Sequence, residues 1–403
     1  MNVFARALRP ARPDTVAPVP DHLERAKAAA IERSGWGLRF DAFQPRNAAF
    51  WVFWVLVLAG AWTAFGQFRT VAAPIAPTIA VGGFVLALYG ALFWWVTRTM
   101  DRYSTLPAAL VVHAFVWGGF AAPFFFALPA NDAIIDLYGK VFGQSWVASW
   151  APGLTAPFTE ELAKGIGLVL LITLARRIVR TAFDAFILGA FLGLGFQVLE
   201  DLLYVAQTAG GDFGTDPWGA GLRILVLRMT TGAVGHIAYS AIFATGLLLL
   251  IGTPAQPRRI GRGILLVLTA MVLHGLFDSV GGFAGPHAGL VFPILLLVTA
   301  IALVCVLLVF HATVRNERDD MRAVLAPEVA SGVLAPGELD AVSGDGRARR
   351  RFVAARGRRR RGLRRALLQA VRELADDAVR PDRAAELEHA RAEVARIRAR
   401  SHR

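Results

Sequence analysis

The sequence predicts an all-α protein: a polytopic transmembrane helical bundle of about eight spans, with a small basic helical cytoplasmic tail. Composition is the first sign, because 55% of the residues are hydrophobic, only 18% are charged and the mean hydropathy is +0.49. In an ordinary soluble protein about a quarter of the residues are charged. The second sign is that long apolar stretches fill residues 48–311, whereas both ends of the chain are polar.

Eight apolar stretches are long enough to cross a bilayer, which takes about 20 mostly apolar residues in a helix. In chain order these predicted spans are 48–67, 76–97, 106–129, 150–174, 182–206, 229–251, 262–284 and 288–311. The first begins too late, after too polar a stretch, to be a cleavable signal peptide. We expect three regions: a flexible basic cytoplasmic N-terminus over 1–47 with a short helix around 21–33, a membrane core over 48–311, and a basic tail over 312–403.

The basic residues of the loops predict on which side of the membrane each loop lies. Alternate loops carry arginine clusters, namely Arg98 with Arg102, then Arg176, Arg177 and Arg180, then Arg258, Arg259 and Arg262. The intervening loops carry fewer basic residues, and Arg223 and Arg228 in one of them are expected to be interfacial anchors. By the positive-inside rule, both termini are cytoplasmic in a multi-pass protein of the cell membrane.

Much of the formal net charge of +13 belongs to the tail, since 22 of the 43 Lys and Arg residues lie after position 311. Residues 347–365 form an arginine cluster, and 364–380 and 382–400 have helical apolar spacing on either side of Pro381. We expect a helical hairpin beside the inner leaflet, where clustered arginines favour anionic lipid. A topology anchor without a partner is the alternative, and nucleic acid is not an expected partner.

Ionisable residues lie inside four of the predicted spans. They are Glu160, Glu161 and Lys164 in the fourth span, Glu200 and Asp201 in the fifth, His236 in the sixth, and His274 and Asp278 in the seventh. Charged side chains inside a bilayer are costly, so they usually face a polar cavity and mark function. Counted along each helix from its outer end, six of these residues lie about 10–16 Å below the outer surface, namely Glu160, Glu161, Glu200, His236, His274 and Asp278. This shared depth predicts one polar site in the outer half of the membrane.

Spacing within each helix adds to this prediction. Lys164 is three and four residues from the two glutamates, so it can reach either, and His274 shares a face with Asp278. Gly189 and Gly193 form a pair of small residues that allows a neighbouring helix to approach closely. Asp201 is about 100° round the helix from Glu200, so we leave it out of the predicted site.

The residue types indicate hydrolysis by activated water. Two adjacent carboxylates in a low dielectric favour sharing a proton, and such a group can accept a proton from water while a histidine or acid assists. The sequence shows neither a Ser or Cys nucleophile in a triad pattern nor a His-Glu-x-x-His zinc motif, and Cys305 alone makes no Cys-based metal site. A metal such as zinc remains open, with candidate ligands Glu200, His236, His274 and Asp278.

These motifs resemble those of the PrsW intramembrane proteases, relatives of the CAAX prenyl endopeptidases. Glu160-Glu161-x-x-Lys164 resembles the first motif and Phe196-x-x-x-Glu200 the second, where CAAX enzymes have histidine. His236, followed by small residues as far as Gly246, is similar to the third motif, and His274-x-x-x-Asp278 to the fourth.

The resemblance covers about 48–311 and implies that this region is a peptidase core whose substrates are membrane-anchored proteins. It also implies site-1 cleavage of anti-sigma factors on the outer side, with Glu160 or Glu161 as base and His274 as its partner. Members of the family have been described both as metallopeptidases and as glutamate peptidases. A proton-coupled transporter is the alternative function, because transporters also use carboxylates and histidines near the membrane midplane.

Overall fold

The computed structural model describes residues 19–69, 75–211, 215–355, 357 and 360–402. These residues form helices joined by short loops and contain no strand, so the all-α prediction is confirmed. The chain divides into two compact units: Arg33–Arg315, and Met1–Glu32 together with Asn316–Arg403. Of the N-terminus that we expected to be flexible, residues 1–18 lie outside the described residues, and α1 (Asp21–Ser34) begins where the sequence predicts a short helix.

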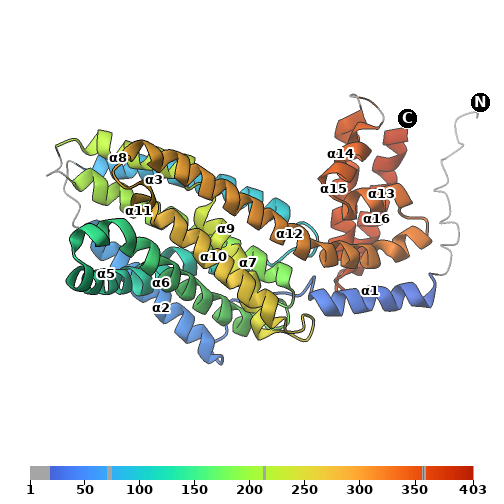
Figure 1. The fold of residues 1–403 in the computed structure, drawn as a ribbon. Coiled ribbons are helices and arrows are strands. Elements are labelled where there is room, and N and C mark those ends of the chain that lie inside the picture. Colours follow the sequence, from blue (N-terminus) through green and yellow to red (C-terminus); the bar gives the residue numbers. More distant parts are fainter. Residues whose placement is uncertain (1–18, 70–74, 212–214, 356, 358–359, 403) are drawn as a thin grey trace, which may run out of the picture. The chain divides into compact units, whose positions relative to one another are not determined.

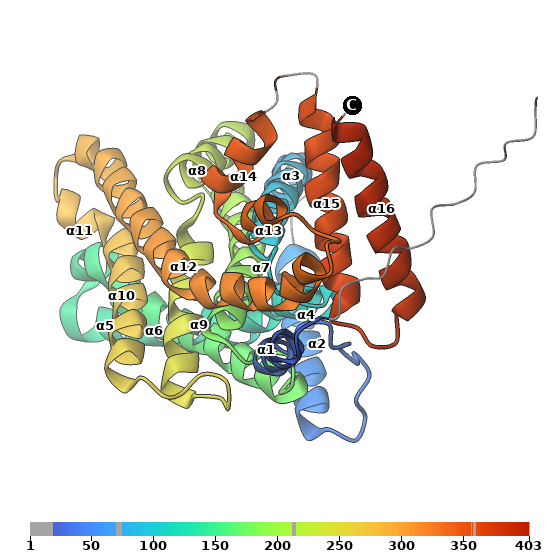
Figure 2. The same cartoon turned by 90° about the vertical axis from the view of Figure 1, so that its right-hand side faces the viewer.

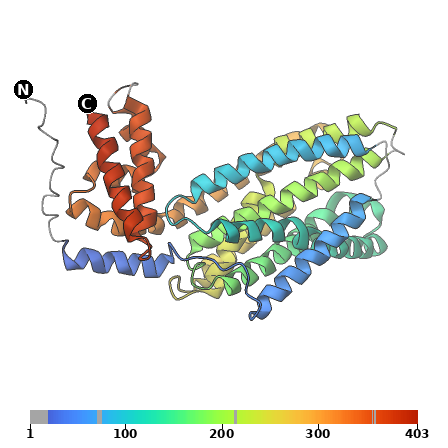
Figure 3. The same cartoon turned by 180° about the vertical axis from the view of Figure 1, so that it is seen from behind.

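The larger unit is a bundle of long helices (Figure 1; Figure 3). Its elements are α2 (Ala48–Arg69), α3 (Ala76–Met100), α4 (Ala108–Val116), η1 (Trp117–Ala127), α5 (Leu128–Phe142), α6 (Gln144–Leu174), α7 (Ala182–Gly210), α8 (Pro217–Thr231), α9 (Gly235–Ile251), α10 (Ile260–Asp278), α11 (Val280–Ala284), η3 (Ala288–Leu290) and the start of α12 (Val291–Ala330).

The helices agree with a protein that crosses a membrane several times. Among the described residues, six helical segments are long and apolar enough to do so, and α8 with α9 makes a seventh if this bent pair is one span. The helix α6 is also long enough, at 31 residues, but Glu160, Glu161 and Lys164 interrupt its apolar run. Counting α6 brings the number to about eight, as the sequence predicts.

Two predicted spans differ from the helices observed. The third was expected to end near 129, but α4, η1 and α5 continue one helical path to Phe142 through a π-helical stretch that contains Pro123. The sixth was expected to be continuous over 229–251, but α8 and α9 meet at a 45° bend between Thr231 and Gly235. The Tyr89 hydroxyl donates to the carbonyl oxygen of Ala233 at 2.7 Å, which satisfies a backbone group left exposed by the break.

The helix α7 lies at the centre of the larger unit and is buried along most of its length. The predicted pair of small residues on this helix lies against α9. A Cβ atom built on Gly193 would lie 2.1 Å from the carbonyl oxygen of His236, and one on Gly189 would lie 2.4 Å from that of Ser240. Because only glycine leaves this room, the two backbones pack in direct contact. The contact fixes where α9 presents His236.

The smaller unit is a separate helical body made of α1, the end of α12, α13 (Pro336–Ser343), α14 (Gly346–Ala354), α15 (Arg361–Ala378) and α16 (Ala384–His402). Figure 2 shows α15 and α16 side by side, as the predicted hairpin requires. Buried Glu328 pairs with Arg391 at 2.6 Å. Of the arginine cluster 347–365, residues 356, 358 and 359 lie outside the described residues, and binding of anionic lipid there stays a prediction.

Candidate active site

Four helices of the larger unit bring the predicted site residues into one buried cluster. They are Glu160, Glu161 and Lys164 from α6, Glu200 from α7, His236 from α9, and His274 and Asp278 from α10. Each has a charged or imidazole atom within 3.7 Å of such an atom on another member. Helices that are far apart in sequence therefore present their ionisable groups to a common centre.

Glu160 occupies that centre. Its Oε2 atom lies 3.5 Å from His274 Nε2, 3.7 Å from His236 Nδ1 and 3.7 Å from Lys164 Nζ. None of these contacts is a hydrogen bond, and Oε2 is a buried atom without a hydrogen-bond partner among the described residues. Its other oxygen accepts a hydrogen bond of 3.4 Å from the side-chain amide of Asn131 on α5. A carboxylate oxygen surrounded by three nitrogens but bonded to none of them leaves room for a shared ligand.

Glu161 forms the deepest part of the cluster and is completely buried. Its carboxylate accepts hydrogen bonds from Lys164 Nζ at 2.8 Å and from the Ser240 hydroxyl at 3.1 Å. The ammonium group of Lys164 also lies 3.9 Å above the ring of Phe196. Buried charges are stable only when they are paired in this way. The sequence predicted that Lys164 could reach either glutamate, and the structure places it closer to Glu161.

The contacts of His236 define which of its nitrogens carries the proton. Lys164 Nζ lies 3.1 Å from Nδ1, and an ammonium group can only donate, so Nδ1 accepts. Nε2 then holds the proton and donates it to Glu200 Oε2 at 2.9 Å. The lone pair of Nδ1 consequently faces the centre of the cluster, on the side of Glu160. This is the tautomer that a metal-ligating imidazole requires.

His274 also lies between carboxylates, but its Nδ1 has no hydrogen-bond partner among the described residues. Its Nε2 lies near the carboxylates of Glu160, at 3.5 Å, and Asp278, at 3.2 Å. Its Nδ1 lies 3.3 Å from Glu161 Oε1, and its ring stacks on that of Tyr239 with 5.0 Å between the centroids. Both histidines therefore direct one nitrogen toward Glu160 and the other toward a different carboxylate.

Arg228 is the residue of this region that sequence reasoning missed. We expected an interfacial anchor, because the sixth span was taken to begin at Met229. The structure instead buries Arg228 within the α8–α9 pair, where its guanidinium contacts Glu200 at 2.5 Å and also pairs with Asp201. Glycines at 232 and 235, just before His236, were a signal of the helix break that could have revealed it. Arg223, by contrast, is exposed and pairs only loosely with Asp216, at 3.4 Å.

Asp201, which we left out of the predicted site, belongs to its outer support. The side-chain amide of Gln197 donates to Asp201 Oδ2 at 2.8 Å, and the Oε1 atom of the same amide accepts from the backbone N–H of His236 at 3.3 Å. Asp201 therefore helps to hold the first turn of α9 through Gln197, in addition to pairing with Arg228.

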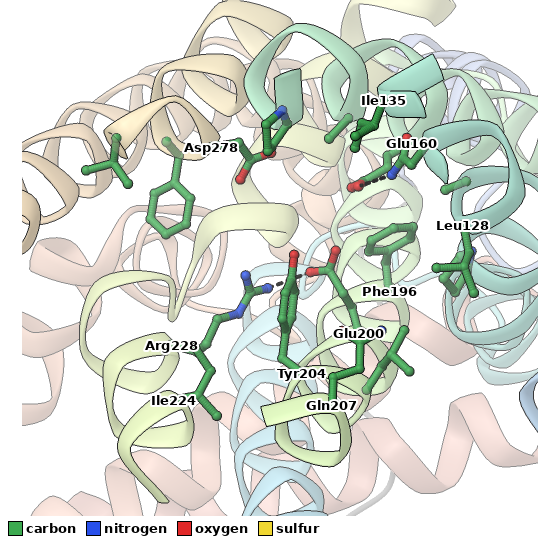
Figure 4. A pocket seen from close by; sticks show the side chains of 18 of the residues that line it. Leu128, Ile135, Glu160, Phe196, Glu200, Tyr204, Gln207, Ile224, Arg228 and Asp278 are labelled. Carbon is green, nitrogen blue, oxygen red and sulfur yellow. Dashed lines mark hydrogen bonds and ion pairs between the residues drawn. The ribbon is translucent and has the colours of Figure 1, made fainter. Parts of the chain in front are cut away.

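A cavity of about 450 Å³ opens onto the cluster. Glu160, Glu200, Arg228 and Asp278 form its polar wall, and Figure 4 shows Glu200 directed toward Arg228, with Tyr204 beside them. The other walls are mainly apolar, with side chains such as Leu128, Ile135, Ile224, Leu227, Phe277 and Leu295. Glu161 is not among the lining residues. An apolar ligand can thus reach Glu160 and Asp278 but not Glu161.

The cluster can accommodate a metal ion. Ligand atoms of Glu160, His236 and His274 lie within 4.8 Å of one another. The carboxylate of this group is Glu160, whereas the sequence suggested Glu200 or Asp278; Glu200 is instead bonded to the far nitrogen of His236 and to Arg228. The unpartnered Oε2 of Glu160 supports the fit. Two imidazoles and one carboxylate are an ordinary donor set for zinc.

The net charge of the buried cluster is also compatible with a bound metal ion. Together with Asp201 and Arg228, which lie against it, the cluster contains five carboxylates but only two cations, Lys164 and Arg228. The carboxylates are those of Glu160, Glu161, Glu200, Asp201 and Asp278. An excess of negative charge is costly in a low-dielectric interior. Bound protons or a divalent cation would neutralise it.

Comparison with protein-family models matches residues 106–310 to the PrsW family intramembrane metalloproteases. The match covers about half of the chain and contains every residue of the cluster. A search among curated proteins found no match, and a search among solved structures found none either. With its apolar helices and its buried cluster of acids and histidines, this chain belongs to the PrsW family of intramembrane metalloproteases and is a membrane-embedded peptidase.

Proposed function

We propose that this protein is a metal-dependent endopeptidase that hydrolyses peptide bonds of membrane-anchored proteins in the outer half of the bilayer. The orientation of the two histidines carries this proposal. Each directs one ring nitrogen toward Glu160, while the other nitrogen lies against a supporting carboxylate, Glu200 for His236 and Glu161 for His274. Carboxylates orient metal-ligating histidines by accepting a hydrogen bond from the second ring nitrogen. His236 makes this bond, and His274 Nδ1 lies within ion-pair distance of Glu161.

Glu160, His236 and His274 are the residues that would hold the metal, and zinc is the ion we expect. When bound, it would supply a Lewis acid that polarises the scissile carbonyl and makes water nucleophilic near neutral pH. Lys164 would then release His236 Nδ1 and keep its hydrogen bond to Glu161, which is the shorter of the two contacts. The alternative mechanism is that Glu160 activates water directly, without a metal. The two mechanisms differ in whether cleavage requires a bound metal.

Asp278 is the group that we assign to proton transfer. Its side chain is 21% exposed, which makes it the most accessible carboxylate of the seven predicted site residues, and it lines the cavity. It accepts a proton as the water oxygen bonds to the peptide carbon, and it returns a proton to the amine as the carbon–nitrogen bond breaks. Glu161 is buried away from the cavity, so we assign it the holding of His274 and Lys164 rather than the role of base.

The cavity supports an apolar peptide substrate. Its mainly apolar walls suit the side chains of a transmembrane segment, and it extends to Gln207, at the end of α7 that the loop charges place outside. A single-span anti-sigma factor, the substrate that the resemblance to the PrsW family implies, is the substrate that we propose. The family match does not favour the alternative of a proton-coupled transporter.

The test uses the purified full chain, reconstituted with a single-span anti-sigma factor whose cleavage products are identified by mass spectrometry. We expect a zinc chelator to abolish cleavage and added zinc to restore it. Glu160→Gln and His274→Ala should lose both bound zinc and cleavage. Asp278→Asn should retain zinc but cleave at least 100-fold more slowly, because it lacks only the proton acceptor.

Two outcomes would overturn parts of this proposal. Undiminished cleavage by protein shown to be free of metal would exclude the metal-dependent mechanism and support carboxylate-activated water. If the three single variants Glu160→Gln, His236→Ala and His274→Ala all cleave at the normal rate, the cluster is not the active site.

A further inference from the structure

We propose that Arg228 is a positioning residue that holds His236 in its metal-binding state through Glu200. This inference rests on the proposed metal site and adds a residue outside the motifs that the sequence revealed. Arg228 does not contact Glu160 or His274 in the described structure, so its effect on the centre must pass through another side chain.

Arg228 binds two neighbouring carboxylates at once. Its Nη2 donates to Glu200 Oε2 at 2.5 Å, and its Nε donates to Asp201 Oδ1. The centre of the Tyr204 ring lies 4.4 Å from the guanidinium carbon, and the Arg228 side chain is only 12% exposed. Figure 4 shows the two side chains beside each other. A planar guanidinium presents its donors to two acceptors from separate nitrogens in fixed directions, whereas an ammonium group is a compact charge on a flexible stem. The pair of acids on α7 is therefore matched to arginine specifically.

The same oxygen of Glu200 links Arg228 to His236. Oε2 accepts from Arg228 Nη2 and also from His236 Nε2, at 2.9 Å. As long as Arg228 holds Glu200 in this rotamer, Oε2 stays in place as the acceptor for His236 Nε2, and Nδ1 stays turned toward Glu160. Without Arg228, Glu200 would be a buried carboxylate with one fewer donor. It would then be free to rotate away, and His236 would lose the acceptor that fixes the orientation of its ring.

The broken helix explains how both partners reach one carboxylate. Arg228 lies in the last turn of α8 and His236 in the first turn of α9, and the 45° bend lies between them. Two contacts hold the break: Tyr89 donates to Ala233, and Thr299 on α12 donates to the carbonyl oxygen of Thr231. The bend, which a straight sixth span would lack, thus allows Arg228 and His236 to contact the same oxygen of Glu200.

The experiment measures zinc affinity of the full-length protein in detergent, by competition with a chromogenic chelator, and the visible spectrum of the cobalt-substituted form. We expect Arg228→Ala to bind zinc 10- to 100-fold more weakly, the range typical of lost outer partners of metal ligands. Arg228→Lys should be intermediate, because the ammonium group keeps the positive charge but lacks the rigid, paired donors of the guanidinium. Arg223→Ala, on the exposed face of the same helix, is the matched control and should bind zinc as the wild type does.

A double-mutant cycle tests the route. If Arg228 acts through Glu200, the variant that combines Arg228→Ala with Glu200→Ala should bind zinc no more weakly than Glu200→Ala alone. Unchanged zinc affinity and an unchanged cobalt spectrum in both Arg228 variants would overturn this inference while leaving the proposed function intact. Absence of Glu160-dependent zinc binding in the wild type would instead overturn the proposed metal site itself. If Arg228→Ala does not fold, Arg228→Lys decides by the same two readouts.

Discussion

Lys164 supplies the positive charge on which the deepest carboxylate of the cluster depends. Glu161 is fully buried, and Lys164 Nζ, 2.8 Å away, is its closest cation. Removing one member of a buried ion pair typically destabilises a protein by about 3–5 kcal/mol, because the other charge is left without a partner. We therefore expect Lys164→Met to unfold at a clearly lower temperature than the wild type, as measured by thermal unfolding in detergent.

Lys140 provides the control for this prediction. It is exposed at the end of α5, and substitutions at such positions usually change stability by less than about 0.5 kcal/mol. Lys140→Met should thus unfold as the wild type does. Equal unfolding temperatures for Lys164→Met and Lys140→Met would show that the stability of the protein does not depend on the ion pair of Lys164 with Glu161.

At the scale of the elements, the contact between α7 and α9 sets the position of His236. A Cβ at Gly193 would meet the carbonyl oxygen of His236 at 2.1 Å, and this is backbone that cannot rotate away. In Gly193→Ala, α9 must shift. Misplacing a catalytic group by about 1 Å can cost about 100-fold in rate. We expect a loss of this order in cleavage of the reconstituted anti-sigma factor, with weaker zinc binding.

Gly66→Ala is the matched substitution for this test. Gly66 lies in α2, and a Cβ at this position would meet nothing within 4 Å. Alanine is also the better helix former, so the variant should be as active and as stable as the wild type. Were Gly193→Ala to cleave at the rate of Gly66→Ala, the close approach of the two helices would not be what positions His236.

At the scale of the whole molecule, the loop charges predict that both termini are cytoplasmic, and accessibility can test this. Cys305 is the single cysteine, so Cys305→Ser provides a background without thiols. On that background, Ser145→Cys should react with a membrane-impermeant maleimide in intact cells, because the α5–α6 connection is predicted to lie outside. Pro257→Cys, between α9 and α10, should react only after permeabilisation. Both positions are exposed within the larger unit, so burial will not hide them.

The reverse labelling pattern would place the α5–α6 connection in the cytoplasm. The cavity would then open toward the cytoplasmic side, and cleavage of anti-sigma factors from outside would be excluded. Labelling of both positions in intact cells would contradict the predicted span count between them.

Several features could be predicted because they depend on local spacing alone. The thickness of a bilayer sets the length of an apolar helix, so the run of apolar segments predicts a polytopic bundle. Because a charge is costly inside a bilayer, Glu160, Lys164 and His274 can be identified as candidate functional residues without knowing how their helices pack. Likewise, the 3.6-residue period of a helix places Lys164 beside its two glutamates, and the paired glycines of α7 predict that another helix packs closely against it.

Other features depend on which helices meet and at what angle, which the local pattern does not contain. That Glu160, rather than Glu200 or Asp278, lies between the two histidines follows from how α6, α9 and α10 are rotated against one another. Arg228 joins the cluster only because α8 and α9 bend at a break that hydropathy cannot detect. The chain by itself determined which side chains must be kept away from lipid, since that depends on residue type and depth. Tertiary packing alone decided which of them touch, because a contact needs both partners at a defined rotation, distance and angle.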